Sequence, residues 1–174
     1  MRRRSYEIED HLAASPLSYT LLHPSSCASN LLYTAESVAA ESILPAAAPA
    51  GRVDYIDIRD LSQAAALVLR EPALHGKTYD LSGPDAYTFP EIAELLTTIL
   101  GHEVTFVAAS PDERRSAMAR NGIAPCFAEL LLSLETRAEA GQIGTVTTTL
   151  NDLLGREPRT VEQFLIENAS RFRT

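Results

Sequence analysis

Short apolar runs and longer amphipathic stretches alternate along the chain. Residues 17–22, LSYTLL, form a β-rich run that stops at a His-Pro pair and predict a buried strand. Residues 52–58, RVDYIDI, alternate apolar and polar side chains with the period of two that a half-buried strand shows. Shorter strands are expected at residues 77–83, KTYDLSG, and at residues 103–109, EVTFVAA.

Helices are expected between these strands. The first covers residues 2–14 and ends at a Ser-Pro pair, because proline cannot continue a helix. Capping boxes, in which two side chains satisfy free N–H groups at a helix start, are predicted at residues 88–91, 110–113 and 160–163. The other helical stretches are residues 30–44, 59–71, 126–141 and 146–155, and residues 45–51, PAAAPAG, are read as a loop. The alternation predicts an α/β fold with a short, mainly parallel sheet and flanking helices.

The composition is that of an ordinary globular domain. The 174 residues fit one domain, residues 1–174, with 45% hydrophobic and 22% charged residues. A net charge of -8 repels phosphate backbones and anionic lipid, so no nucleic acid and no membrane are expected as partners. Two cysteines and four histidines show no metal-ligand spacing, which predicts no metal site. No apolar run has the length of a signal peptide or of a membrane span of about 20 residues, which predicts a cytoplasmic protein.

The residues with the most chemistry follow the first strand, in the stretch YTLLHPSSCASN that ends at Asn30. In an open α/β sheet, ligands bind just beyond the carboxyl ends of the strands. His23 is the candidate general acid or base there, and a hydrogen bond to a neighbouring carbonyl is the alternative role. Ser25, Ser26 and Asn30 are candidates to hold a substrate carbonyl or hydroxyl, although Ser26 could equally cap the following helix.

Pro24, Cys27 and Tyr33 complete the candidate substrate-binding set. A nucleophilic role for Cys27 requires a nearby base, and His23 lies four residues earlier. A small buried thiol is the favoured interpretation of Cys27. Tyr33 follows the loop closely enough to reach a ligand.

A charge cluster, Asp57, Arg59 and Asp60, follows the second strand. We expect the two acids to cap or flank the next helix N-terminus, where the helix dipole favours negative charge. Arg59 is expected to pair with one of them. The cluster is therefore interpreted as structural.

Four ordered stretches carry a family resemblance. They read HLAASPLSYTLLHPSSCASNLL, VDYIDIRDLSQAAALVL, GKTYDLSGPDAYTFPEIAELLTTILGHEVTFV and LLGREPRTVEQFLIENASRF. Together they resemble the NmrA-like branch of the atypical short-chain dehydrogenase/reductases, over residues 6–172 and most specifically at residues 57–60 and 76–88. That branch includes NAD(P)H-dependent quinone and azo-type reductases and redox-sensing regulators. The resemblance implies the second half of a Rossmann-type short-chain dehydrogenase fold, without the glycine-loop nucleotide half.

The resemblance also places individual residues. Residues 24–30 correspond to the family's P-x-x-F-x-x-N loop beside the nicotinamide and the substrate, which raises Asn30 above the other candidates. Cys27 takes the aromatic position of that loop, and His23 replaces the arginine of the family's L-R-P with a group that titrates near neutrality. The Tyr-x-x-x-Lys pair of typical short-chain dehydrogenases is absent, because an aspartate stands at that spacing from Tyr6 and raises a tyrosine pKa.

The sequence shows no glycine-rich binding motif for a dinucleotide. None of the eight glycines falls in a G-x-G-x-x-G or G-x-x-G-x-x-G spacing, whose glycines let backbone amides approach a pyrophosphate. The nearest approach, GQIG at residues 141–144, is interpreted as a helix stop and a turn. We therefore expect no cofactor for the isolated chain, and NADPH or NADH if another chain complements it.

Three functions remain open. The favoured one is cofactor-free acid/base chemistry on a carbonyl-containing, polyketide-like substrate, such as isomerisation, cyclisation or dehydration. In it His23 is the acid/base, and Asn30 and Ser26 hold the carbonyl oxygen. The alternatives are the C-terminal part of an NAD(P)H-dependent quinone-type oxidoreductase and a non-catalytic ligand-binding or sensor module. Because a half sheet exposes an edge strand, a homodimer or a chain carrying the nucleotide half is expected as partner.

Overall fold

The computed structural model describes residues 2–173, with side chains described from residue 7 onward. The side chain of Tyr6, which bears on the missing Tyr-x-x-x-Lys pair, lies outside the described residues. The strands are β1 (Leu21–Pro24), β2 (Ser26–Cys27), β3 (Ile43–Ala46), β4 (Val53–Ile56), β5 (Thr78–Leu81), β6 (Ala86–Tyr87) and β7 (Thr105–Ala108). β1 pairs with β5, β2 with β4 and β3 with β7 in parallel, whereas β4 pairs with β6 antiparallel. The expected α/β fold with mostly parallel pairing is confirmed, but the strands form several short sheets instead of one.

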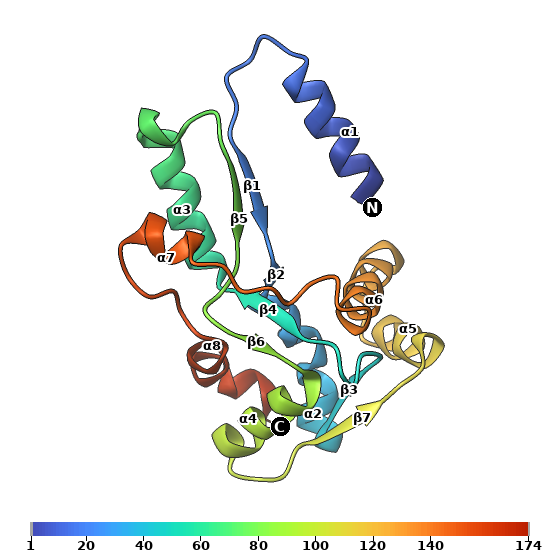
Figure 1. The fold of residues 1–174 in the computed structure, drawn as a ribbon. Helices are drawn as coiled ribbons and strands as arrows, with labels where there is room; N and C mark the ends of the chain where they lie inside the picture. Colours follow the sequence, from blue (N-terminus) through green and yellow to red (C-terminus); the bar gives the residue numbers. More distant parts are fainter. Residues whose placement is uncertain (1, 174) are drawn as a thin grey trace.

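Helices flank these strands on several sides. They are α1 (Arg2–Ala13), the 3-10 helix η1 (Ala28–Thr34), α2 (Ala35–Glu41), α3 (Ile58–Arg70), the 3-10 helix η2 (Pro72–Leu74), α4 (Phe89–Leu100), α5 (Pro111–Arg120), α6 (Pro125–Glu139), α7 (Thr149–Leu154), α8 (Val161–Glu167) and the 3-10 helix η3 (Ala169–Phe172). Figure 1 shows α3 and α7 alongside the β1–β5 pair, α5 and α6 packed together elsewhere, and α1 standing apart at the N-terminal end. Within residues 2–173, no helix combines the length and the apolar character that crossing a bilayer demands.

Local side-chain chemistry starts several helices as the sequence predicts. At α4, the hydroxyl of Thr88 accepts the N–H of Glu91 while the Glu91 carboxylate accepts the N–H of Thr88 at 2.7 Å. The same capping box opens α5 and α8. Asp57 caps α3 by accepting the N–H of Arg59 at 2.8 Å, and the Arg59 guanidinium pairs with it at 2.6 Å. These predictions are confirmed because each depends on residues no more than three positions apart.

Asp60, in the first turn of α3, contacts residues that lie far along the chain. Its side chain is fully buried and accepts the backbone N–H of Arg159 at 2.6 Å. It also pairs with the guanidinium groups of Arg156, at 2.6 Å, and of Arg159. A carboxylate expected only to flank a helix start therefore attaches the α7–α8 connection to α3.

The half-burial predicted for the strand at residues 52–58 is wrong for β4. All four of its residues are buried. Val53 and Tyr55 belong to the larger hydrophobic core, and Ile56 belongs to a second cluster on the other side of the strand. The polar member, Asp54, is covered because its carboxylate accepts the N–H of Gly144 at 2.9 Å. Both faces of β4 are thus covered, as in the interior strands of a parallel sheet.

The helix predicted over residues 30–44 ends early. Ser42 follows α2 with a φ of 55°, a left-handed conformation that ends the helix. Its carbonyl accepts the N–H of Thr105 at 2.9 Å, which starts the pairing of β3 with β7. Residues 43–46 are therefore strand, so the loop predicted at residues 45–51 begins two residues late. The distant partner β7 decides this, and local propensity does not report it.

Helix α6 packs against the loop between β3 and β4. Glu135 is buried, and one of its carboxylate oxygens accepts the N–H of Ala47 at 2.7 Å while the other pairs with Arg114 of α5 at 2.7 Å. One turn later, the carboxylate of Glu139 accepts the N–H of Gly51 at 3.0 Å. These contacts hold α6 close against the loop.

Gly51 is required in this loop because a side chain there would meet the backbone of α6. In a Gly51→Ala variant the new Cβ would lie 2.5 Å from the carbonyl carbon of Ala138 and 2.5 Å from the amide nitrogen of Glu139. Because both atoms are backbone, α6 must move, and we expect a loss of about 1–3 kcal/mol of unfolding free energy. Urea unfolding measures it, with the exposed Ala50→Ser as matched control. Equal midpoints for the two variants would show that α6 does not pack on Gly51.

Candidate functional site

A cavity of about 650 Å³ lies at the carboxyl ends of β1 and β5, with α6 as its opposite wall. This is where an α/β sheet places its ligands, and the volume suits a small organic molecule. The lining side chains come from β1, β2, β4, β5, η1, α6 and the residues that follow β5 and α6. They are His23, Pro24, Ser25, Ser26, Cys27, Asn30, Asp54, Asp80, Leu81, Ser82, Phe127, Leu130, Leu134, Arg137, Gln142, Ile143, Thr145 and Thr147.

The loop predicted from the sequence does line this cavity. His23, Pro24, Ser25, Ser26, Cys27 and Asn30 all contribute to its wall. The amide of Asn30 donates to the hydroxyl of Ser26 at 3.1 Å, so these two candidates act as one polar group. The hydroxyl oxygen of Ser25 is buried and has no hydrogen-bond partner among the described residues. The loop therefore lines the cavity with several polar residues from one short stretch of chain.

His23 is bound to two carboxylates. Its Nδ1 lies 3.1 Å from Asp80 of β5, and its Nε2 lies 3.1 Å from Glu9 of α1. A neutral imidazole carries one N–H, so both contacts are donor hydrogen bonds only when the ring is protonated. His23 thus joins α1 to the β1–β5 pair at the rim of the cavity. The sequence left open a hydrogen bond from His23 to a neighbouring carbonyl. In the structure its ring nitrogens instead face two carboxylates that are distant in sequence.

Cys27 lies half-buried against the second hydrophobic cluster. Burial raises the pKa of its thiol, and the negative charge of Asp57 adds to that effect. A raised thiol pKa disfavours the thiolate, which is the nucleophilic form. The environment therefore supports the small, inert thiol and not a Cys-His nucleophile.

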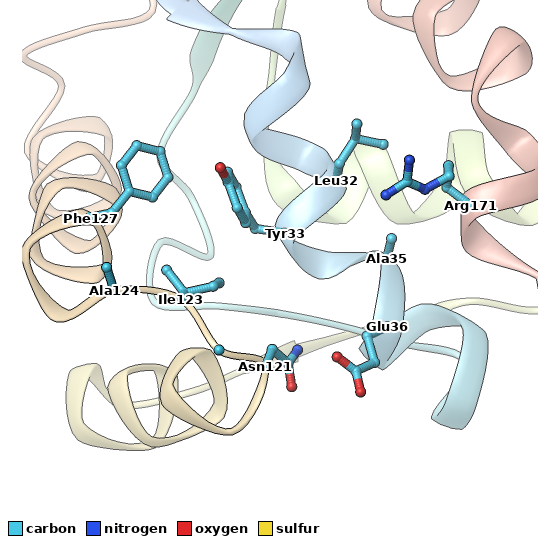
Figure 2. Close-up of a pocket in the computed structure, with 10 residues that line it drawn as sticks. Leu32, Tyr33, Ala35, Glu36, Asn121, Ile123, Ala124, Phe127 and Arg171 are labelled. Carbon is cyan, nitrogen blue, oxygen red and sulfur yellow. The ribbon is translucent and has the colours of Figure 1, made fainter.

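Tyr33 lines a different cavity, of about 510 Å³. Figure 2 shows its ring facing Phe127 of α6, with Ile123, Asn121 and Glu36 along the rest of the wall. The two ring centroids lie 5.0 Å apart with the planes tilted by 55°. Because Phe127 lines both cavities, Tyr33 contacts a wall of the main cavity without entering it. The predicted reach of Tyr33 towards the ligand is limited to this indirect contact.

Several site residues are missing from the sequence-based set. Asp80 and Glu9 hold His23, and Arg137 projects from the last turn of α6 beside Asp54. Burial raises the pKa of Asp54, and the N–H of Gly144 and the charge of Arg137 oppose the rise. The spacing Phe127, Leu130, Leu134, Arg137 places all four on one helix face, and this stripe ending in arginine is the one signal that could have revealed the wall.

The cavity thus has a polar side and an apolar side. The loop after β1 supplies hydrogen-bonding groups, and the α6 face supplies Phe127, Leu130 and Leu134. Such a site suits a flat, mainly apolar molecule whose carbonyl or hydroxyl oxygen binds the loop. Among the side chains described from residue 7 onward, no cluster of three or more His, Cys, Asp or Glu residues is arranged to hold a metal ion.

Two further glycines of this chain lie where a side chain would meet the backbone of a neighbouring segment. A Cβ on Gly83 would meet the carbonyl oxygen of Tyr55, and a Cβ on Gly144 would meet that of Arg52. These two glycines, like Gly51, allow close packing of the chain on itself. Gly141, in the GQIG stretch, has a φ of 64° and follows the C-terminal end of α6, as the sequence predicts.

Comparison with known proteins finds a dehydrogenase and NAD(P)H-dependent reductases among the proteins that this chain resembles. No family model matches the chain. It is 30% identical over 156 residues to an agroclavine dehydrogenase of Claviceps fusiformis, covering 87% of this chain and 54% of the relative. It is 26% identical over 166 residues to an NAD(P)H azoreductase of Xenophilus azovorans, covering 95% of this chain and 58% of the relative. The crystal structure of an NADPH-dependent quinone oxidoreductase from Escherichia coli matches with a TM-score of 0.88, 28% identity, 94% coverage of this chain and 60% of that chain.

These similarities place the chain in an oxidoreductase lineage. The chain spans little more than half the length of the relatives it matches. The structural likeness extends over nearly all of this chain, so the strands and helices described above are shared with the matching part of the quinone oxidoreductase.

The thiol environment leads to a measurable difference between the two cysteines. We expect iodoacetamide to modify the exposed Cys126 first at neutral pH, because burial and Asp57 hold the pKa of Cys27 above that of an ordinary thiol. The alkylation rate of Cys27 should still rise at pH values where an ordinary exposed thiol is already ionised. Timed labelling across a pH series, read by peptide mass spectrometry, measures both rates, and a Cys126→Ser variant isolates Cys27. Faster labelling of Cys27 than of Cys126 would instead indicate an activated thiol.

Proposed function

We propose that this chain, which we assign to the NmrA-like family of atypical short-chain dehydrogenase/reductases, is the substrate-binding half of an NAD(P)H-dependent reductase of quinone-type acceptors. The observation that carries the proposal is the cavity at the carboxyl ends of β1 and β5. Its polar loop and apolar α6 wall match the carbonyl edge and the flat ring of a quinone.

Each residue of the loop has a role in this proposal. Asn30 and Ser26, already hydrogen-bonded at 3.1 Å, bind and orient one carbonyl oxygen of the acceptor. His23, held between Asp80 and Glu9, donates the proton that the reduced oxygen requires. Pro24, Ser25 and Cys27 shape the remaining wall.

We place the electron source in a nucleotide-binding half, the part of the fold in which the family's glycine loop is expected. That half, when it holds NADPH or NADH, supplies a hydride. We place its docking surface at the N-terminal end, where the apolar side chains of Ile8 in α1 and of Leu17 are 63% and 64% exposed. Within the described residues, β1 pairs only with β5, which leaves its other edge to accept a strand. The half is either part of the same polypeptide or a separate chain, and a homodimer is the alternative cover.

The cofactor-free acid/base reaction ranks below the reductase. One observation favours it, namely that His23 lines the cavity with a side chain 37% exposed. Against it, both ring nitrogens face carboxylates, and the relatives compared above are oxidoreductases. The non-catalytic sensor differs from both in binding a ligand without converting it.

A hybrid enzyme tests the proposal. The second half of the Escherichia coli quinone oxidoreductase is replaced by this chain, and NADPH consumption is followed with a soluble quinone. We expect turnover by the hybrid and none by the isolated chain. His23→Ala and Asn30→Ala should each lower kcat/KM by roughly tenfold or more, because they remove groups that contact the reacting oxygen. Ser29→Ala, on the same 3-10 helix but outside the cavity lining, is the matched control.

The other outcomes assign the other functions. A hybrid that binds NADPH in calorimetry and binds quinone but never oxidises the cofactor supports the sensor. Binding of NADPH by the isolated chain would show a cofactor seat that the glycine positions do not indicate. Measuring the mass of the isolated chain in solution alongside decides whether a homodimer covers the exposed end.

A further inference from the structure

Arg137 has a buried N–H group that the fold does not use. It lies in the last turn of α6 and lines the 650 Å³ cavity. Its Nε is buried and has no hydrogen-bond partner among the described residues. Ser25, which lines the same cavity, has a buried hydroxyl oxygen that also lacks a hydrogen-bond partner among the described residues. Buried polar groups are nearly always hydrogen-bonded, so these two atoms are exceptions in this fold, and both belong to residues that line one cavity.

A purely structural role accounts poorly for this arrangement. Arginine near a helix C-terminus stabilises the helix dipole, but an exposed side chain does this equally well. Pairing with a carboxylate is the other ordinary role, and the buried pair of α6 is made elsewhere, between Glu135 and Arg114. Asp54 is close enough for the Arg137 charge to act on it, yet its carboxylate bonds the N–H of Gly144.

We propose that Arg137 is a specificity-determining residue that binds an anionic group, a carboxylate, sulfonate or phosphate, on the molecule that occupies this cavity. The planar guanidinium offers parallel N–H groups that match the oxygens of such anions. The apolar stripe of Phe127, Leu130 and Leu134, which precedes Arg137 on the same helix face, contacts the ring of the ligand. The ligand class is therefore a flat, apolar molecule with one negative substituent.

Asp54 sets the strength of this site. Its carboxylate is 7% exposed and lines the cavity beside Arg137. A negative charge there partly cancels the attraction between Arg137 and an anion, so the site is tuned to moderate affinity. A change at Asp54 should therefore alter anion binding in the opposite direction to a change at Arg137. Asp54→Asn removes the charge while its amide oxygen can still accept the Gly144 N–H.

The proposal rests on the assignment of this cavity as the substrate site, but its test measures binding alone. The purified chain is titrated by calorimetry with anthraquinone sulfonate and with the neutral hydroxymethyl anthraquinone. We expect the sulfonate to bind roughly ten- to a hundredfold more tightly. Arg137→Gln should abolish this preference, and Arg137→Lys should retain part of it. Arg120→Gln, the same charge change at an exposed position of α5, should leave it intact.

Asp54→Asn should strengthen sulfonate binding several-fold and leave the neutral probe unchanged, which a structural role of Arg137 would not produce. Thermal midpoints of all variants show whether they fold. Equal binding of the two probes, binding of neither, or a preference that survives in folded Arg137→Gln overturns the proposal. A preference that depends on Arg137, in a chain whose hybrid fails to reduce quinones, keeps the anion site and removes the reductase. Turnover by the hybrid without the preference does the reverse.

Discussion

The attachment of α6 to the loop between β3 and β4 is the contact on which the candidate site depends. Glu135 and Glu139 accept N–H groups of that loop, and Gly51 lets the helix approach it. The same rigid helix carries Phe127 and Arg137 into the cavity on another of its faces. Because a helix moves as a unit, the cavity wall is positioned by contacts that lie outside the cavity.

The buried pair of Arg114 and Glu135 sets geometry more than it adds stability. Each residue is 4% exposed, and removing two charges from water costs about as much free energy as their attraction returns. What the pair provides is a fixed arrangement of the elements that it joins. One Glu135 oxygen bonds Arg114 and the other bonds the Ala47 N–H, so α5, α6 and the end of β3 are held in one arrangement. Losing either partner would leave a buried charge without compensation, which makes alternative packings of α6 unfavourable.

The parts that the sequence predicted are those decided by neighbouring residues. The capping boxes, the Asp57 cap and the polar loop from His23 to Asn30 are each readable within a few positions. The parts it missed depend on partners far along the chain. The Ala47–Glu135 contact spans 88 residues, His23 meets Asp80 57 residues away, and β3 becomes a strand only through β7. The candidate site was therefore found on its loop side and missed on its α6 side.

His23 connects the cavity to the exposed N-terminal end of the chain. Its contact with Glu9 holds α1 at the rim, and α1 carries the exposed Ile8. Any element that buries the apolar side of α1 must then lie beside the cavity mouth as well. In the reductase we propose, that element is the nucleotide-binding half, so one histidine both contacts the acceptor and fixes the helix against which that half packs. Closing the cavity and supplying its electrons would then be a single docking event.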